Sequence, residues 1–392
     1  MNKITNIFCL TDQEAKSMLC KGMKNILVLL TMVTFFFPQI ILSEAAASFE
    51  VLEPTCSLVH GSDHIRENML RATLYVSSDE IWFSGTSAEG GPWIIKTNAQ
   101  GETLLQYQLQ VDADEKITIH SMSKTSNGLL LGIIDDKTTL GRVGLLKANG
   151  QISYTNLGEA KIYAFAPMQD GILVQGVLYD ESNQTCAPQT IRVDQNGQVV
   201  FKRTGASYDI GIDCGMLTSS VCCASNRSIF VLEARGSSEA FHCSYELFCL
   251  DLLGQEKWHV TLDSHFVVYD LTASDDTVYL FGFSGEWDEE GLLLDQQATI
   301  QCFSQEGICQ WTRQFVTPAI YQCGAAKMGI SVATAMEHGI WYICVLDTEG
   351  TIQKQVKIDA QDQYINRPYI LSDDTIVILG MTEEHLVIWN IP

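Results

Sequence analysis

One acidic segment of the chain carries residue types that could bind a ligand. It runs from Ser284 to Asp295 and places Trp287 among carboxylates that include Asp288 and Glu289. An indole ring beside several carboxylates could hold a cation or a basic peptide, with the tryptophan as the anchor. The spacing of the acidic residues does not match a calcium-binding loop. A solvated acidic loop without a ligand is therefore the alternative interpretation.

Aromatic and polar residues in other irregular segments could contribute to the same surface. Their side chains would suit a carbohydrate or a peptide, although any hydrated rim has a similar composition. The residues that we predict to contact a ligand are Trp287, Asp288, Glu289, Tyr208, Asp209, His265 and Tyr321.

The chain has no motif that indicates catalysis or metal binding. It has no G-x-S-x-G nucleophile elbow and no glycine-rich phosphate loop, and its eight histidines lack H-x-H and H-E-x-x-H spacing. None of its 13 cysteines forms a C-x-x-C pair, which weakens the case for zinc. We therefore predict no catalytic residue, no metal ligand and no cofactor.

One pair of cysteines could form a disulfide. Around the turn at Ser304–Gly307, a simple hairpin register places Phe303 opposite Ile308 and Cys302 opposite Cys309. Opposed Cβ atoms in an antiparallel pair lie roughly 4.5–5.5 Å apart, which is close to disulfide reach. The prediction is either a Cys302–Cys309 disulfide or two reduced cysteines that act as small hydrophobic residues.

A repeated β-hairpin must position these residues. Six turns each combine an Asp, Asn or Ser with a glycine, and successive turn glycines are 49, 47, 57, 53 and 43 residues apart. The polar side chain can bond the turn backbone, and glycine adopts positive φ without a steric penalty. This spacing is near the roughly 40–50 residues of propeller repeats. The turn glycines are Gly101, Gly150, Gly197, Gly254, Gly307 and Gly350.

Each period contains four strands, lettered A to D. Runs such as Leu129–Gly132 and Val278–Gly282 are apolar on both faces, which is typical of a buried inner strand. Four-stranded units repeated radially form a β-propeller. We predict an all-β, seven-bladed β-propeller of four-stranded antiparallel blades. In this ring, Phe49–Leu58 pairs as strand D into the last blade, so that no sheet edge is left open. A six-bladed ring is the alternative.

The topology gives the two ends of each blade different roles. The A–B and C–D turns meet at one end, and the B–C and D–A connections meet at the other. The C–D turns are short and stereotyped, whereas the B–C connections vary in length and composition. Variable loops on a rigid scaffold are where binding residues usually lie, so we expect function at the second end.

Two hairpins resemble a known repeat. Cys249–Trp258 and Cys302–Trp311 resemble the quinoprotein-type (PQQ-like) propeller repeat, in which a strand leads through a turn glycine to a Trp that packs between blades. The resemblance covers most of residues 49–392 as a degenerate pattern and implies architecture rather than function. Roughly equivalent positions in other repeats are occupied by Tyr154, Phe201 and Gln106.

The resemblance does not extend to quinoprotein catalysis. Enzymes of that type carry a disulfide between adjacent cysteines, and Cys222 and Cys223 are adjacent here. The resemblance would imply a longer, eight-bladed ring with a calcium site and an Asp base. The sequence has no set of residues that matches this site. Two small residues on an inner strand are the simpler interpretation of this pair.

The N-terminal segment has the features of a targeting sequence. Lys21 and Lys24 precede an uncharged apolar run over 25–42, and small residues follow over 43–47. This order is typical of a secretory signal peptide, and an uncleaved membrane anchor is the alternative. Residues 1–22 are long for such a leader, so translation could start at Met18 or Met23. We assign residues 1–47 to this segment and 48–392 to a single propeller domain.

The charge balance limits the partners. Asp and Glu total 47 against 24 for Lys and Arg, a formal charge of -23, which repels nucleic acid. We predict a monomeric, non-catalytic propeller, secreted or at the cell surface, that binds a protein or glycan and contacts membrane only through an N-terminal anchor. The alternative is a quinoprotein-like oxidoreductase or a glycan hydrolase with a site in the central channel.

Overall fold

Short apolar and β-branched segments form strands throughout the part of the chain that the structure describes. All regular elements in this part are β-strands, as the sequence predicts. The computed structural model describes residues 50–51, 56–59, 74–76, 80–86, 91–98, 102–109, 116–180, 182–209, 222–237, 240–274, 277–287, 293–315, 320–325, 331–337, 340–359, 364–365, 369–370, 376–381 and 385–391.

The chain divides into two units, Met1–Ala47 and Ser48–Pro392, and every described residue lies in the second. The predicted targeting segment lies outside the described residues. Within the described part of the chain, no apolar helix of membrane-spanning length occurs.

Three repeats are simple four-stranded antiparallel sheets, with strands A to D in chain order. Repeat 1 contains β3 (Leu74–Val76), β4 (Ile81–Thr86), β5 (Pro92–Thr97) and β6 (Thr103–Gln108). Repeat 4 contains β15 (Cys222–Ala224), β16 (Ile229–Ser237), β17 (Ala240–Leu250) and β18 (Glu256–Thr261). Repeat 5 contains β19 (Phe266–Ala273), β20 (Thr277–Trp287), β21 (Leu293–Ser304) and β22 (Cys309–Phe315).

Repeats 2 and 3 form one eight-stranded sheet because a single strand serves both. β10 (Ile152–Met168) pairs with β9 as strand D of repeat 2, then with β11 as strand A of repeat 3. Its register shifts between Asn156 and Lys161, around Gly158 with φ of 104°. The other strands are β7 (Ile117–Thr125), β8 (Gly128–Asp135), β9 (Leu140–Leu146), β11 (Gly171–Asp180), β12 (Thr185–Asp194), β13 (Val199–Thr204) and β14 (Tyr208–Asp209).

The N-terminal strands join two different repeats. Repeat 6 contains β23 (Ile320–Ala325), β24 (Ser331–Glu337), β25 (Ile340–Leu346) and β26 (Ile352–Asp359), and β1 (Glu50–Val51) pairs with β26 in parallel. Repeat 7 contains β27 (Tyr364–Ile365), β28 (Tyr369–Ile370), β29 (Ile376–Met381) and β30 (His385–Ile391). β2 (Cys56–Val59) pairs antiparallel with β30, in the place of strand D.

The predicted single strand Phe49–Leu58 is therefore wrong in its extent. Glu50–Val51 pairs with repeat 6, and only Cys56–Val59 pairs with repeat 7. Pro54 lies between them in the sequence and has no N–H to donate to a ladder, which disfavours one continuous strand. The number of blades and the closure of the ring stay predictions.

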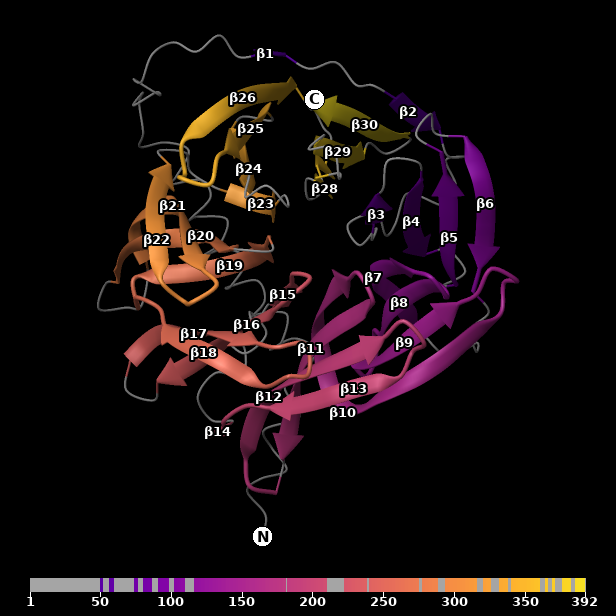
Figure 1. Ribbon diagram of the computed structural model, residues 1–392, viewed down its shortest axis with the longest axis horizontal. Helices are drawn as coiled ribbons and strands as arrows, with labels where there is room; N and C mark the ends of the chain where they lie inside the picture. Colours follow the sequence, from indigo (N-terminus) through magenta and orange to yellow (C-terminus); the bar gives the residue numbers. More distant parts are fainter. Residues whose placement is uncertain are drawn as a thin grey trace, which may run out of the picture. The chain divides into compact units, whose positions relative to one another are not determined.

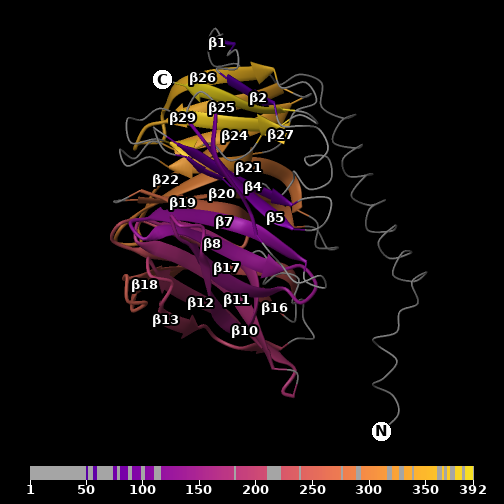
Figure 2. The same ribbon diagram turned by 90° about the vertical axis from the view of Figure 1, so that its right-hand side faces the viewer.

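The first strands of successive repeats lie next to one another. β3 contacts β7, the strand pair β10 and β11 contacts β15, β15 contacts β19, β19 contacts β23, and β23 contacts β28. In Figure 1, β3, β7, β15, β19, β23 and β28 lie innermost in the second unit, and strands D such as β6, β18, β22 and β26 lie outermost. Figure 2 shows the long strands β10, β11 and β12 at one end of the same unit. Strands B are therefore covered on both faces, which explains their continuous apolar sequence.

Apolar clusters fill the spaces between repeats. Phe230 and Leu232 face repeat 5 and pack with Phe266 and Leu280, whereas Val231 faces repeat 3. Alternate residues of one strand thus bury themselves against different neighbours, and each repeat depends on the next for its core.

Candidate functional site

The strand connections separate into two ends. At one end, the Ser228 hydroxyl of an A–B turn donates to Oε1 of Gln305 in the next repeat's C–D turn at 3.0 Å. At the other end, the indole N–H of Trp287 donates to the Ser264 carbonyl oxygen at 2.7 Å, which links a B–C to a D–A connection. We call these the turn end and the loop end.

An acidic side chain closes the C–D turn in the same way in three repeats. Oδ1 of Asp251 accepts the N–H groups of Leu253 and Gln255, both at 2.8 Å. Asp194 and Asp347 accept the equivalent pairs of N–H groups. The predicted turn chemistry is confirmed in the described turns, where φ lies between 78° and 83° at Gly150, Gly197, Gly254, Gly307 and Gly350; Gly101 lies outside them.

These hydrogen bonds favour the charged form of the carboxylates. The N–H of Thr351, followed by that of Glu349, lowers the pKa of Asp347 below its ordinary value. Burial raises the pKa of Asp194, but hydrogen bonds from Gln198 and Asn196 outweigh burial, so the pKa is lowered overall. Both carboxylates therefore accept the hydrogen bonds of the turn in their ionised form.

An aromatic side chain on strand D packs against the turn glycine of the next repeat. A Cβ added at Gly307 would lie 2.9 Å from the Trp258 ring, whose N–H donates to the Gln305 carbonyl oxygen at 2.5 Å. Trp311 contacts Gly350 in the same way. This confirms the prediction that Trp258 packs between repeats. The same contact joins Phe201 to Gly254 and Tyr107 to Gly150.

Two of the predicted equivalents of Trp258 are wrong. In repeat 1 the contact is made by Tyr107, and Gln106 is exposed. Tyr154 is 41% exposed, and the guanidinium of Arg142 stacks on its ring. Strand D of repeat 2 has no bulge after its turn, whereas those of repeats 3, 4 and 5 do, so the same spacing from glycine leads to the opposite face.

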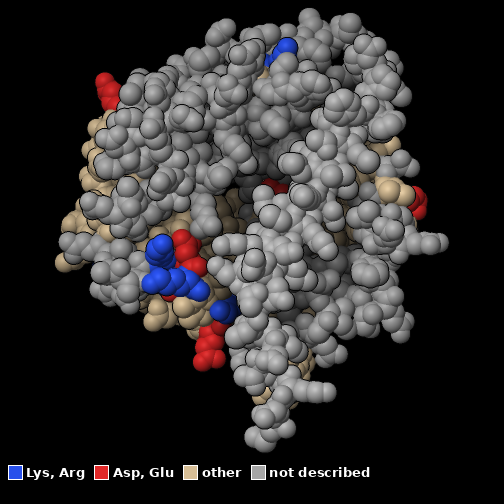
Figure 3. All heavy atoms as spheres, turned by 180° about the vertical axis from the view of Figure 1, so that it is seen from behind, with Lys and Arg blue, Asp and Glu red and all other residues tan. Residues whose placement is uncertain are grey.

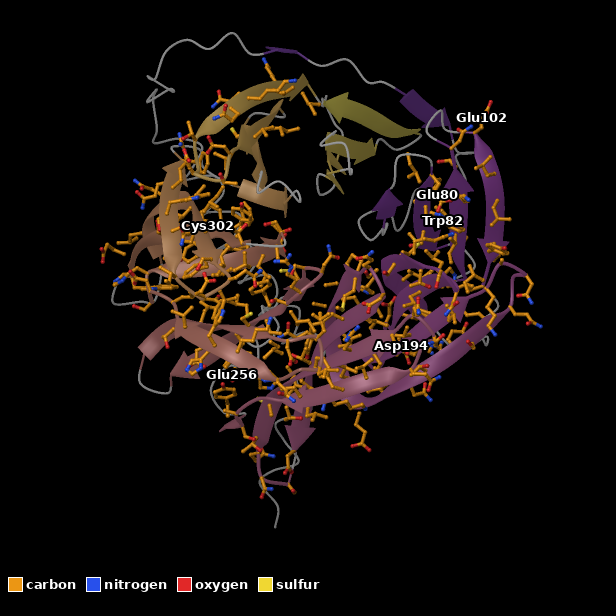
Figure 4. All side chains as sticks on the ribbon, viewed as in Figure 1. Glu80, Trp82, Glu102, Asp194, Glu256 and Cys302 are labelled. Atoms are coloured by element: carbon orange, nitrogen blue, oxygen red, sulfur yellow. The ribbon has the colours of Figure 1, made fainter. Side chains whose placement is uncertain are left out.

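A charged cluster joins repeats 1 and 2 at the turn end. The ammonium groups of Lys96 and Lys124 lie 5.3 and 5.1 Å from the ring centre of buried Trp82. Both pair with the carboxylate of Glu80, and Figure 4 shows Glu80 beside Trp82. The turn end is thus occupied by contacts between repeats.

Two buried carboxylates face each other inside the interface of repeats 3 and 4. Glu233 and Glu246 are paired in the ladder of β16 and β17 and are 1% and 8% exposed. The Arg203 guanidinium pairs with Glu233 and stacks on the Phe248 ring at 4.4 Å. Facing carboxylates can perform acid–base chemistry, but at this burial no substrate reaches Glu233. This cluster holds the interface together.

The loop end brings together two of the predicted ligand residues, Trp287 and His265. The Nδ1 atom of His265 lies 2.9 Å from Oδ1 of Asp263, and its Nε2 atom lies 3.5 Å from Oε2 of Glu286. The N–H of Gly285 donates to the His265 carbonyl oxygen at 3.1 Å. A B–C hairpin and a D–A connection therefore form one surface, as the topology predicts. Asp288 and Glu289 lie outside the described residues.

The innermost strands carry a recurring β-bulge near the loop end. In repeat 5, Val268 pairs with Gly282 and Asp270 with Phe281, which leaves Tyr269 as the extra residue. Repeats 2, 3 and 6 show the same one-residue shift in strand A. A bulge turns the side chain of its extra residue out of the regular alternation. The bulged residues of repeats 2, 3, 5 and 6 are His120, Tyr163, Tyr269 and Tyr321.

Glycines on strand B make room for two of these bulges. A Cβ added at Gly282 would lie 1.9 Å from the carbonyl oxygen of Val267, and one at Gly176 would lie 2.4 Å from that of Lys161. Only glycine allows strand A to approach so closely. The glycines that end several of the apolar runs are thus matched to the bulges.

Two of the bulged tyrosines, Tyr269 and Tyr163, lie against other aromatic side chains. Tyr269 is 61% exposed, and its ring meets that of Phe283 edge to face with centroids 5.2 Å apart. The Tyr163 hydroxyl lies 3.0 Å from that of Tyr179. We call His120, Tyr163, Tyr269 and Tyr321 the aromatic collar. Such rings present flat apolar faces with polar edges, which suits ligand contact.

Tyr208 belongs to a neighbouring cluster rather than to an open loop. Residues Tyr208–Asp209 form β14, which pairs with Thr185 and Cys186 of β12. Tyr208 packs against Val177 and Cys186, beside the two tyrosines of repeat 3 named above. Tyr208 lies in the D–A connection, as predicted, but within a short extra strand that pairs with the start of β12.

Sequence reasoning missed three of the collar residues and misplaced the fourth. Tyr321 was predicted in a D–A connection, but it lies on β23 at the bulge. His120, Tyr163 and Tyr269 have no marker by themselves. The usable signal is a glycine in strand B, such as Gly282, where the facing strand A carries an aromatic residue.

The predicted register around Cys302 and Cys309 is wrong. A bulge after the turn places Phe303 opposite Cys309 and Cys302 opposite Trp311. Cys302 is consequently buried and Cys309 exposed, and neither forms a disulfide. Burial, followed by the nearby Cys309, raises the pKa of Cys302 to about 12, so its thiol stays protonated. In Figure 4, Cys302 lies within repeat 5.

Basic and acidic side chains lie together in one described cluster on the face opposite to that of Figure 1. On the face drawn in Figure 3, the described Lys and Arg side chains gather beside Asp and Glu. Among the described residues, no group of three or more His, Cys, Asp or Glu is placed to hold a metal ion. The described residues of the loop end offer aromatic and charged contacts.

No protein-family model matches the sequence, and no curated protein matches it. Solved structures match over most of the chain. The β-propeller domain of the trilobed protease from Pyrococcus furiosus, described as having open velcro topology, is 12% identical with a TM-score of 0.54, over 83% of this chain and 94% of that one. Catalytically inactive virginiamycin B lyase from Staphylococcus aureus with quinupristin is 11% identical, with a TM-score of 0.51 over 86% and 98%.

A third structure has no catalytic role in its description. The β-propeller domain of Cps50 (Swd1) from Myceliophteria thermophila is 9% identical, with a TM-score of 0.52, over 87% of this chain and 100% of that one. These identities establish the fold alone, and propellers of this kind serve unrelated functions. The chain has a β-propeller fold.

Proposed function

We propose that this protein is an exported, non-catalytic β-propeller that binds a protein or glycan partner through its loop end. The observation that carries the proposal is the recurring bulge in strand A, whose extra residue is a Tyr or His in four repeats. Bulges are enriched next to functional sites, where they redirect a side chain. Export is supported by the N-terminal segment of the sequence.

The contrast with the turn end supports this assignment. Turn-end aromatic residues such as Trp258 are engaged with the next repeat, whereas Tyr269 at the loop end is 61% exposed. A largely exposed aromatic ring on an innermost strand contributes little to packing between repeats. Ligand contact gives such a residue a role that its packing does not.

A binding screen with paired variants tests the proposal. The full-length chain would be screened on glycan and peptide arrays as wild type, as His120→Ala/Tyr269→Ala, and as Tyr154→Ala. Tyr154 is a matched control because it is an exposed tyrosine on strand D, outside the collar. We expect the collar variant to lose the main signals and the control to keep them. Equal signals from the two variants would contradict the proposal.

A further inference from the structure

Repeat 5 differs from the other repeats in its charge. Between Lys257 and Arg313 the sequence contains ten Asp and Glu residues and no Lys or Arg. The loop end of repeat 2, by contrast, contains two lysines. The backbone N–H of Lys137 donates to Asp135, and the Nζ atom of Lys161 donates to the Thr138 carbonyl oxygen at 2.6 Å. The one basic residue of repeat 5 is Arg313 on β22, whose guanidinium donates to the Gly350 carbonyl oxygen at the turn end, so the negative charge at the loop end of this repeat is largely unopposed.

Two acidic side chains of repeat 5 lie beside His265 at the loop end. The side chains of Glu286 and Asp263 are 79% and 65% exposed, and both flank His265. Glu286 precedes Trp287, whose indole N–H donates to the Ser264 carbonyl oxygen. Asp270 follows the bulged Tyr269 in the sequence. Aromatic faces attract organic cations, and nearby carboxylates strengthen this preference.

We propose that the loop end of repeat 5 binds a polypeptide segment that carries Arg or Lys side chains. The ring of Tyr269, fixed by Phe283, offers a face for the aliphatic stem or the guanidinium plane, and Glu286 and Asp263 offer acceptors for the charged head. The carboxylates come from two separate connections, which suits charges spaced along an extended chain. This inference rests on the proposed function and names the ligand class.

The test uses the full-length chain and three fluorescent probes. The first is the peptide (Arg-Gly-Ser)₃. The second has citrulline in place of arginine, which keeps the shape and removes the charge. The third is chitohexaose, a neutral glycan. Anisotropy titrations would be run with wild type, Tyr269→Ala and Glu286→Gln, and with Tyr154→Ala and Glu349→Gln as exposed controls away from this surface.

We expect the arginine peptide to bind at least tenfold more tightly than the citrulline peptide. Tyr269→Ala should weaken binding about tenfold and Glu286→Gln about threefold, and both controls should stay within twofold of wild type. Equal binding of the two peptides, equal effects of controls and site variants, or no binding of the arginine peptide would overturn the inference. Binding of chitohexaose that depends on Tyr269 would overturn it while leaving the proposed function intact.

Discussion

The turn end and the loop end of the same repeats differ in how regular their structure is. At the turn end, a polar side chain closes the turn, a glycine takes positive φ, and an aromatic residue of the preceding repeat covers the glycine. At the loop end, connection lengths vary and strand A is bulged in four repeats. The regular end is determined by the need to pack repeat against repeat. The irregular end is free to present side chains outward.

The largest effect on this comparison should come from Trp258→Ala. Removing the ring leaves a cavity between repeats 4 and 5 and an unused acceptor at Gln305, so the free energy of unfolding should fall by about 3 kcal/mol. Chemical denaturation measures the loss. Trp258→Phe keeps most of the packing and should lose about 1 kcal/mol. Losses under 1 kcal/mol for the Ala variant would show that the turn end is not the stabilising end.

Gly282→Ala should destabilise the loop end. The added Cβ meets the Val267 carbonyl oxygen, so strand A must move away or lose its bulge, at a cost of about 2 kcal/mol. The same displacement should change the exposure of the neighbouring Tyr269. Denaturation and acrylamide quenching of tyrosine fluorescence check the two effects. An unchanged stability would mean that the bulge does not require this glycine.

Asp251→Ala should have a smaller effect. Two N–H groups, of Leu253 and Gln255, lose their acceptor, and the free energy of unfolding should fall by about 1 kcal/mol. Asp251→Asn retains an acceptor oxygen and should recover most of this loss. If the Asn variant is as unstable as the Ala variant, the carboxylate acts through its charge rather than through the turn.

Asp194 should contribute a dependence of stability on pH. Its pKa in the folded chain is lowered from 3.8, so the stabilisation is present above that value and is lost as the pH falls through the folded pKa. Asp194→Asn cannot titrate, so its stability should decline less steeply below about pH 4. Denaturation curves collected between pH 6 and pH 2 compare the two proteins, and parallel curves would rule out this role.

Much of the turn end is predictable from sequence because its rules are local. Asp251 and Gly254 predict their turn, and the position of Trp258 after that turn predicts that it packs between repeats. The rules fail where one extra residue reverses the alternation. The bulge after the turn of repeat 5 removes Cys309 from its predicted place opposite Cys302. Strand D of repeat 2 lacks such a bulge, so Tyr154 does not take the place of Trp258.

The loop end is less predictable because its register depends on contacts between strands. The sequence indicates that Trp287 and His265 lie at the same end, and the structure brings their segments together. Nothing local to Tyr269 identifies it as bulged. Its bulge depends on Gly282, which lies across the ladder and 13 residues further along the chain. The collar is a property of paired strands and not of one motif.

The most direct test of the account measures stability and affinity for one variant, Tyr269→Ala. Because this side chain is 61% exposed, its removal should change the free energy of unfolding by less than about 0.5 kcal/mol. The same protein should bind the partner recovered by screening at least tenfold more weakly than wild type. A loss of stability with unchanged affinity would contradict the account, because Tyr269 would then be a packing residue like Trp258.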